Sequence, residues 1–86
     1  MKTYPLLISS PDGDLFRGEA GMLIVRGTEG DLAVMAGHIP FVTGIVRGKC
    51  TVVTADEERK EGIIEDGILT VDADSVTVLT SGLAWN

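Results

Sequence analysis

The organisation of the whole chain is visible in one stretch, Gly27-Thr28-Glu29-Gly30-Asp31-Leu32-Ala33-Val34-Met35-Ala36-Gly37-His38-Ile39-Pro40. Turn-forming residues cluster at Gly27–Gly30, an aliphatic run follows, and a second cluster ends it at Gly37–Pro40. Gly, Asp and Pro favour turns because each supports backbone geometry that a strand interior does not use. The stretch predicts a short strand near Asp31–Met35, bounded by exposed loops where contacts with other molecules tend to lie.

The same alternation of turn signals and apolar runs continues in both directions along the chain. Runs of about four to eight residues at this spacing are typical of β-sandwiches and barrels. The predicted strands lie near Tyr4–Ser9, Phe16–Arg26, Asp31–Met35, Thr43–Arg47, Lys49–Ala55, Arg59–Ile64, Ile68–Asp72 and Val76–Thr80. No window has the apolar spacing of an amphipathic helix. We therefore predict an all-β, two-sheet sandwich in which residues 1–86 form a single domain.

Two local patterns predict how particular strands are arranged. In Lys49-Cys50-Thr51-Val52, alternation places Cys50 and Val52 on one face and Lys49 and Thr51 on the other. The pair Asp66-Gly67 stands between two apolar runs and predicts a tight hairpin, a turn type that needs positive φ. The acidic segment Ala55–Gly62 is charged on every side, which predicts a solvated hairpin tip rather than a helix.

Composition excludes several classes of function. The net charge of −6 lies entirely in residues 51–86, which hold two bases and eight acids, and this balance repels nucleic acid. Apolar runs such as Met22–Val25 are far too short to cross a bilayer, so we expect no direct membrane insertion. Cys50 is the only cysteine, so no internal disulfide forms, which favours a reducing compartment and a buried structural role.

The chemistry-bearing residues do not form a catalytic constellation. His38 is the only histidine and has no second ligand that would complete a metal site, so we read it as a loop residue or a contact to another protein. The loop at Gly27–Gly30 lacks the Gly-Lys-Ser/Thr ending of a phosphate-binding loop. We expect no catalytic residue, no metal and no cofactor. Trp85 predicts either a terminus packed across the sheet or an exposed anchor for a partner.

Several motifs in order resemble the epsilon subunit of F-type ATP synthases. They are Pro11-Asp12-Gly13, Phe16, Gly18-Glu19, Gly27–Leu32, Gly37–Pro40, Gly48, Gly67–Val71 and Val76–Leu79. The match covers nearly the whole chain and preserves spacing. It implies the family's N-terminal domain, a flattened sandwich of about ten strands.

The resemblance also implies a function and its partners. It implies a non-catalytic rotor subunit at the foot of the central stalk that helps couple ion flow to ATP synthesis. Glu29, Gly30 and Asp31 match the loop that meets the c ring, whereas Ser10, His38 and Thr43 match positions that face the gamma subunit. The implied location is peripheral, at the cytoplasmic face of a bacterial cell membrane.

Three departures from the family pattern bear on these expectations. Ala33 stands where the family usually has Gly, and Ala36 where it commonly has Pro, so the local turn could differ. Nothing follows Asn86, where many members continue into two helices, so we expect this chain to lack the inhibitory switch and the nucleotide site that those helices carry.

Two competing hypotheses remain open from the sequence. One is a free-standing β-sandwich that binds a small molecule, which would need a concave site lined by aromatic or convergent polar groups. The other is an enzyme that uses His38 with an acid. An isolated chain with an orphaned interface is also expected to self-associate.

Overall fold

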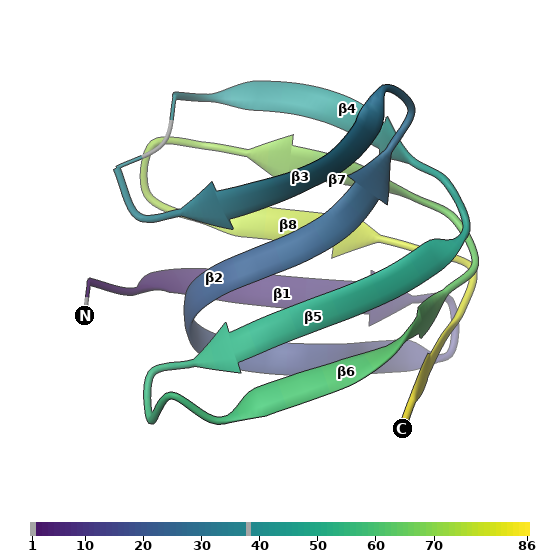
Figure 1. Ribbon diagram of the computed structural model, residues 1–86, viewed down its shortest axis with the longest axis horizontal. Helices are drawn as coiled ribbons and strands as arrows, with labels where there is room; N and C mark the ends of the chain where they lie inside the picture. Colours follow the sequence, from purple (N-terminus) through teal and green to yellow (C-terminus); the bar gives the residue numbers. More distant parts are fainter. Residues whose placement is uncertain (1, 38) are drawn as a thin grey trace.

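The computed structural model describes residues 2–37 and 39–86, and these residues form nine β-strands and no helix (Figure 1). The strands are β1 (Tyr4–Ser10), β2 (Gly13–Gly27), β3 (Gly30–Met35), β4 (Phe41–Ile45), β5 (Gly48–Thr54), β6 (Arg59–Ile64), β7 (Gly67–Val71), β8 (Val76–Leu79) and β9 (Leu83–Trp85). The all-β prediction is confirmed. No helix in the described part of the chain is long and apolar enough to cross a membrane.

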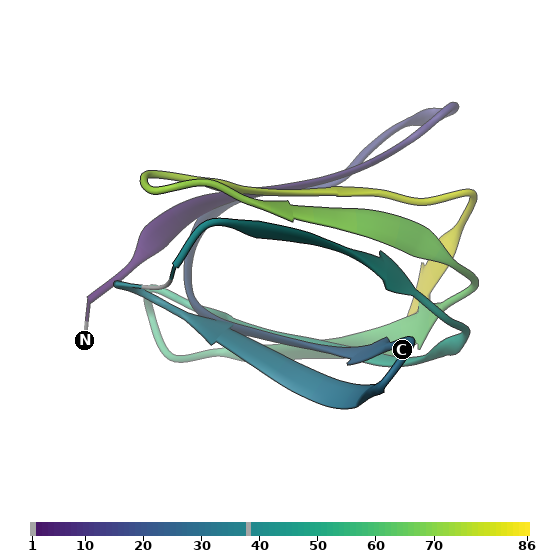
Figure 2. The same cartoon turned by 90° about the horizontal axis from the view of Figure 1, so that it is seen from above.

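The strands form two layers that face each other across an apolar core (Figure 2). Layer one contains β4, β7, β8 and β1, followed by the first part of β2, while layer two contains β3, the second part of β2, β5, β6 and β9. Strand β2 serves both layers because its pairing with β5 shifts register between Ala20 and Met22, where the strand bends. A single pair, Gly27 with Ile45, also joins β2 to β4.

The core between the layers consists of aliphatic side chains contributed by alternate residues of the strands. The largest fully buried side chains are those of Leu6, Ile8, Leu23, Ile64, Leu69, Val25, Val34, Val52, Val71, Val76, Val78 and Cys50. β-Branched residues dominate this set, as expected for a core built on pleated sheets from a chain with few aromatics. Each such side chain contributes about 1.5–3 kcal/mol by leaving water.

All eight strands predicted from the sequence are present, with ends that differ by up to three residues. The ninth, β9, was not predicted, because three residues are too few to show a period of two. Its existence depends on pairing with β6, from Gly62 opposite Trp85 to Ile64 opposite Leu83. The turn at Ala55–Glu58 joins the paired strands β5 and β6, which confirms a hairpin tip in the first half of the predicted segment Ala55–Gly62. The second half, from Arg59 to Gly62, belongs to β6, and Gly62 is buried.

The hairpin predicted at Asp66-Gly67 is wrong. Strand β6 pairs with β5 and β9, and β7 pairs with β4 and β8, so Glu65–Asp66 instead connects the two layers. Gly67 is not one of the described residues with a positive φ, which the predicted turn type would need. The pattern was misread because a turn signal between apolar runs specifies a change of direction but not which strands then pair.

The structure also tests what the sequence predicted for two single residues, Thr51 and Ala33. Thr51, placed with Lys49 on a polar face, is only 4% exposed, because β2 and β6 flank its strand on both sides. Ala33 lies within β3 opposite Ile24 and has no positive φ, so this departure from the family pattern leaves the strand regular.

Candidate protein-interaction surface

An exposed acidic turn joins β2 to β3 at the right-hand end of the sandwich in Figure 1. Glu29, Gly30 and Asp31 lie together in this turn, and all three are exposed. Gly30 has φ +121°, a conformation that side-chain-bearing residues rarely adopt, so glycine is what allows the tight reversal. The Asp31 carboxylate lies 3.3 Å from Nε of Arg26, and both side chains are mostly in solvent. The turn therefore presents carboxylates on a well-supported hairpin.

A second surface is an open groove of ≈ 640 Å³ beside the β1–β2 hairpin. Its lining residues come from four segments of the chain: Ser9, Ser10, Pro11, Ile45, Asp66, Gly67, Ile68, Leu79, Thr80 and Ser81. Ile68 and Leu79 are directly opposite each other on β7 and β8 and are 53% and 56% exposed. Adjacent aliphatic side chains exposed in a groove with a polar rim are typical of a protein-interaction site.

The far wall of the groove is held by one carboxylate. Asp66 accepts a hydrogen bond from the backbone N–H of Ser81 and another from its hydroxyl, both at 2.9 Å. These hydrogen bonds stabilise the charged form and lower the pKa of Asp66 below its ordinary value. The backbone N–H of Glu65 also donates to the carbonyl of Gly82 at 2.9 Å. Three hydrogen bonds therefore fix this wall.

The near wall is the tip of the β1–β2 hairpin, where Ser10 lies. The Ser10 hydroxyl donates to the carbonyl of Gly13 and accepts from the backbone N–H of Asp12, each at 3.2 Å. Ser10 therefore stabilises its own turn as well as lining the groove. Figure 2 shows this hairpin rising away from the body of the sandwich.

Thr43 and His38 are the other two residues that the resemblance places against the gamma subunit. Thr43 lies on β4 opposite Leu69, which is fully buried, so its half-buried side chain is on the inner side of layer one and not in the groove. His38 lies outside the described residues. The structure therefore places Glu29, Gly30 and Asp31 together in the acidic turn. Ser10 lies in the separate groove, and Thr43 lies in neither the turn nor the groove.

Sequence reasoning missed the floor of the groove, although a signal was present. Val76-Thr77-Val78 alternates cleanly, and Leu79 then falls on the same face as Thr77. Ile68 likewise shares a face with Thr70. An aliphatic residue on the polar face of each of two neighbouring strands indicates an exposed apolar site, which is visible only once their pairing is known.

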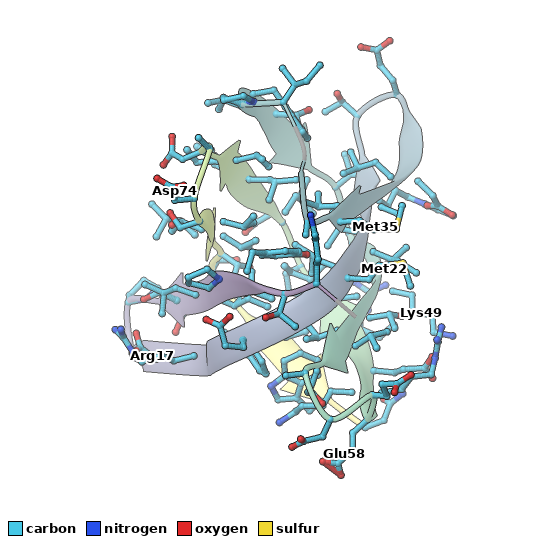
Figure 3. All side chains as sticks on the ribbon, turned by 90° about the vertical axis from the view of Figure 1, so that its left-hand side faces the viewer. Arg17, Met22, Met35, Lys49, Glu58 and Asp74 are labelled. Atoms are coloured by element: carbon cyan, nitrogen blue, oxygen red, sulfur yellow. The ribbon has the colours of Figure 1, made fainter. Side chains whose placement is uncertain are left out.

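A third apolar area covers the outer side of layer two. Met22 and Met35 are directly opposite each other on β2 and β3, and Figure 3 shows both on the same side of the molecule. Met35 is 56% exposed, whereas Val53, opposite Met22 on β5, is 6% exposed. This area lies on layer two, whereas Ile68 and Leu79 lie on layer one.

The reactive groups of the described residues do not point to catalysis. No group of three or more His, Cys, Asp or Glu in residues 2–37 and 39–86 could hold a metal ion. Burial raises the pKa of the Cys50 thiol to about 11, which keeps it protonated and unreactive. Burial also raises the pKa of Tyr4, whose hydroxyl donates to the carbonyl of Val34 at 2.6 Å.

Comparison with known proteins gives a consistent result. Residues 3–86 match the model of the family described as ATP synthase, Delta/Epsilon chain, beta-sandwich domain. The chain is 32% identical over 84 residues to the sodium-ion-specific ATP synthase epsilon chain of Acetobacterium woodii, and 36% identical over 87 residues to the ATP synthase epsilon chain of Ruminococcus albus. These alignments cover 98% and 100% of this chain but only 63% and 64% of the relatives.

Solved structures show the same fold. A chain of the Euglena gracilis mitochondrial ATP synthase superposes with a TM-score of 0.89 at 20% identity, covering 96% of this chain and 53% of that one. A chain of the Tetrahymena thermophila mitochondrial ATP synthase central stalk and c-ring superposes with a TM-score of 0.79 at 13% identity, covering 96% and 66%. The sandwich is therefore shared well beyond the range of sequence similarity.

Proposed function

Because the chain belongs to the family of ATP synthase delta/epsilon chain beta-sandwich domains, we propose that it is a rotor subunit of the central stalk of an F-type ATP synthase. Residues 1–86 act as one sandwich domain that binds the gamma subunit and the c ring and helps couple ion translocation to ATP synthesis. The subunit acts at the cytoplasmic face of a bacterial cell membrane, without entering the bilayer. It transmits force between neighbours and carries out no catalysis.

The groove is the surface that we assign to the gamma subunit. The observation that carries this assignment is the adjacent exposure of Ile68 and Leu79 in a groove whose rim is polar. A partner side chain that fills such a groove removes apolar area from water, and the rim supplies hydrogen bonds that orient it. Ser10 contributes at the rim, and Thr43 supports the layer from within.

The acidic turn is the surface that we assign to the c ring. Glu29 and Asp31 are exposed on a hairpin tip, and their carboxylates can accept hydrogen bonds from basic or amide groups on a neighbouring protein. Contacts of this kind specify register more than they add affinity. Two contact sites on different parts of one stiff sandwich are what the transmission of torque requires.

A binding experiment tests the assignment to gamma. The full chain, the Leu79→Glu variant and the Met35→Glu variant are titrated with the purified gamma subunit of the same enzyme. Leu79 and Met35 are equally exposed, at 56%, on opposite layers, so each variant adds the same charge at a matched site. We expect at least a tenfold loss of affinity for Leu79→Glu only. Equal affinities for all three proteins contradict the assignment.

A charge reversal tests the assignment to the c ring. Assembly of the Glu29→Lys/Asp31→Lys variant with gamma and c ring is compared with that of Asp74→Lys, which alters an exposed acid in another turn. We expect weaker retention of the c ring for the double variant only, with a difference that shrinks at high salt. Loss of the c ring with Asp74→Lys as well indicates a general charge effect.

The alternative of a small-molecule-binding sandwich is tested by calorimetry. The groove has a volume within the range of ligand pockets, but none of the described residues that line it is aromatic. We expect no heat on titration with ATP or common sugars. Saturable heat that the Leu79→Glu variant abolishes favours the alternative.

A further inference from the structure

The side chain of Lys60 lies close to two aromatic rings, at the edge of the sandwich formed by β6 and β9. The Nζ of Lys60 is 5.0 Å from the centroid of the Trp85 ring and 5.9 Å from that of Phe16. The Trp85 Nε1–H donates to the carbonyl of Leu15 at 3.0 Å. Lys60 and Trp85 belong to layer two, and Leu15 and Phe16 to the hairpin of layer one, so these contacts join the layers.

The hairpin is also held at its base, where the N–H of Ala55 donates to the carbonyl of Glu19 at 3.2 Å and the N–H of Thr80 donates to the carbonyl of Ser9 at 3.0 Å. The side chains of Leu15 and Phe16 pack against the core. The described part of β2 from Gly13 to Glu19 pairs with β1, and its other edge has no strand partner. That edge carries the Leu15 carbonyl to which Trp85 donates. Next to the hairpin tip, the contacts of Trp85 and Lys60 therefore join the free edge of β2 to layer two.

The same hairpin forms one wall of the groove, through Ser10 and Pro11. The opposite wall is fixed by the hydrogen bonds from Ser81 to Asp66. The base of the hairpin is fixed to the opposite wall, because the N–H of Thr80 donates to the carbonyl of Ser9 at 3.0 Å. The tip beyond Ser9, which carries Ser10 and Pro11, projects from this fixed base, so its orientation sets the width of the groove at the rim.

We propose that Lys60 and Trp85 are positioning residues that form a latch between strand β9 and the β1–β2 hairpin and thereby set the width of the partner-binding groove. The latch itself is independent of what binds, whereas its effect on gamma rests on the function proposed above. By linkage, a partner that fills the groove also stabilises the latched hairpin.

The chemistry of the latch explains why a lysine stands at this position. A cation over an aromatic face is attracted by the ring quadrupole, and arginine makes the same interaction at least as well. A neutral side chain of similar length keeps the packing but loses that attraction. Lys60→Arg should therefore preserve the latch, and Lys60→Met should weaken it about two- to fivefold.

A distance measurement tests the latch without any partner. Spin labels are attached at Asp12→Cys, on the hairpin, and Asp72→Cys, at a turn of layer one, and Cys50 is fully buried and unreactive. The distance distribution is measured in the Lys60→Met, Lys60→Arg and Trp85→Phe backgrounds. Lys49→Met serves as the control, because Lys49 pairs with Glu61 away from the aromatic rings.

We expect a broader, longer distribution for Lys60→Met and Trp85→Phe, and the parental distribution for Lys60→Arg and Lys49→Met. Far-UV circular dichroism verifies that each variant is folded, and Lys60 is exposed, so its replacement leaves the core intact. An unchanged distribution in Lys60→Met and Trp85→Phe overturns the latch, as does equal broadening in Lys49→Met.

Binding to the gamma subunit separates the latch from the proposed function. Where the hairpin loosens and gamma affinity falls in Lys60→Met but recovers in Lys60→Arg, the latch and its role in partner binding are both supported. Where the hairpin loosens and gamma affinity stays at the parental value, the latch is supported and the assignment of the groove to gamma is overturned.

Discussion

The hydroxyl of Tyr4 on β1 donates a 2.6 Å hydrogen bond to the carbonyl of Val34 on β3, joining layer one to layer two through the core. Both residues are buried, at 4% and 2% exposure. Val34 lies three residues after Asp31, so the bond also anchors the strand that carries the acidic turn. Tyr4 and Trp85 thus supply one interlayer hydrogen bond each, near opposite edges of the sandwich.

The first prediction concerns this bond. Tyr4→Phe keeps the ring but removes the donor, and we expect a loss of about 1–2 kcal/mol in the free energy of unfolding, since a buried acceptor loses a partner. Urea denaturation measures the loss. Leu7→Ala, on the same strand but half-buried, provides a comparison in which no hydrogen bond changes. A Tyr4→Phe protein as stable as the parent contradicts the assigned role.

The second prediction is a loss of stability at alkaline pH. The pKa of Cys50 is raised from 9.0 to about 11 in the folded state, so above pH 9 the unfolded chain loses a proton that the folded chain retains. The unfolded state is then favoured progressively up to about pH 11, by about 2–3 kcal/mol in total. Tyr4, whose pKa is also raised, adds to this trend above pH 10.

The measurement is the free energy of unfolding by urea between pH 8 and pH 11, in the parent and in Cys50→Ala. The variant loses core packing at every pH, but its slope between pH 9 and pH 11 should be shallower. Parallel slopes in the two proteins mean that Cys50 does not titrate in the way the structure implies.

The third prediction concerns the wall of the groove. The pKa of Asp66 is lowered by hydrogen bonds from Ser81, so the stability that these bonds supply is present above the ordinary carboxyl pKa and is lost as the pH falls through the lower folded value. We expect faster amide exchange at Ser81 in Asp66→Asn, monitored by NMR, while Asp74→Asn leaves that rate unchanged. The Asp66 carboxyl resonance should itself titrate below its usual pH range.

The fourth prediction concerns Gly62, where β6 meets β9. A Cβ at this position would overlap the carbonyl of Ala84, which belongs to the strand backbone and cannot rotate away. Gly62→Ala should displace β9 and cost about 1–3 kcal/mol. Gly82→Ala is the control, because a Cβ there meets only Glu65 Cγ at 3.8 Å. Trp85 fluorescence and denaturant titration report the difference, and equal behaviour of the two variants contradicts the close approach.

Much of the fold could be predicted from local pattern. Turn residues around Gly27–Gly30 and the runs between them identify eight strands, since alternation and turn chemistry act over a few residues. The pairing of those strands could not be predicted in the same way. Asp66-Gly67 looks like a hairpin in sequence and is a crossover in the structure, because strand pairing depends on contacts with residues far along the chain.

The candidate interaction surfaces also differ in how far the sequence predicts them. The exposed acidic turn at Glu29–Asp31 follows from its own composition, and its exposure is as expected. The floor of the groove could not be predicted from local composition, because Ile68 and Leu79 become neighbours only when β7 pairs with β8.

What the sequence determined by itself is the β class, the strand positions, the aliphatic core and the turn that carries Glu29 and Asp31. These follow from period, propensity and turn chemistry, which operate between near neighbours. Only the tertiary structure decided that Trp85 reaches the carbonyl of Leu15, 70 residues earlier, and that Asp66 holds Ser81. Such contacts arise when two layers pack, and no local pattern encodes the distance between segments that meet only then.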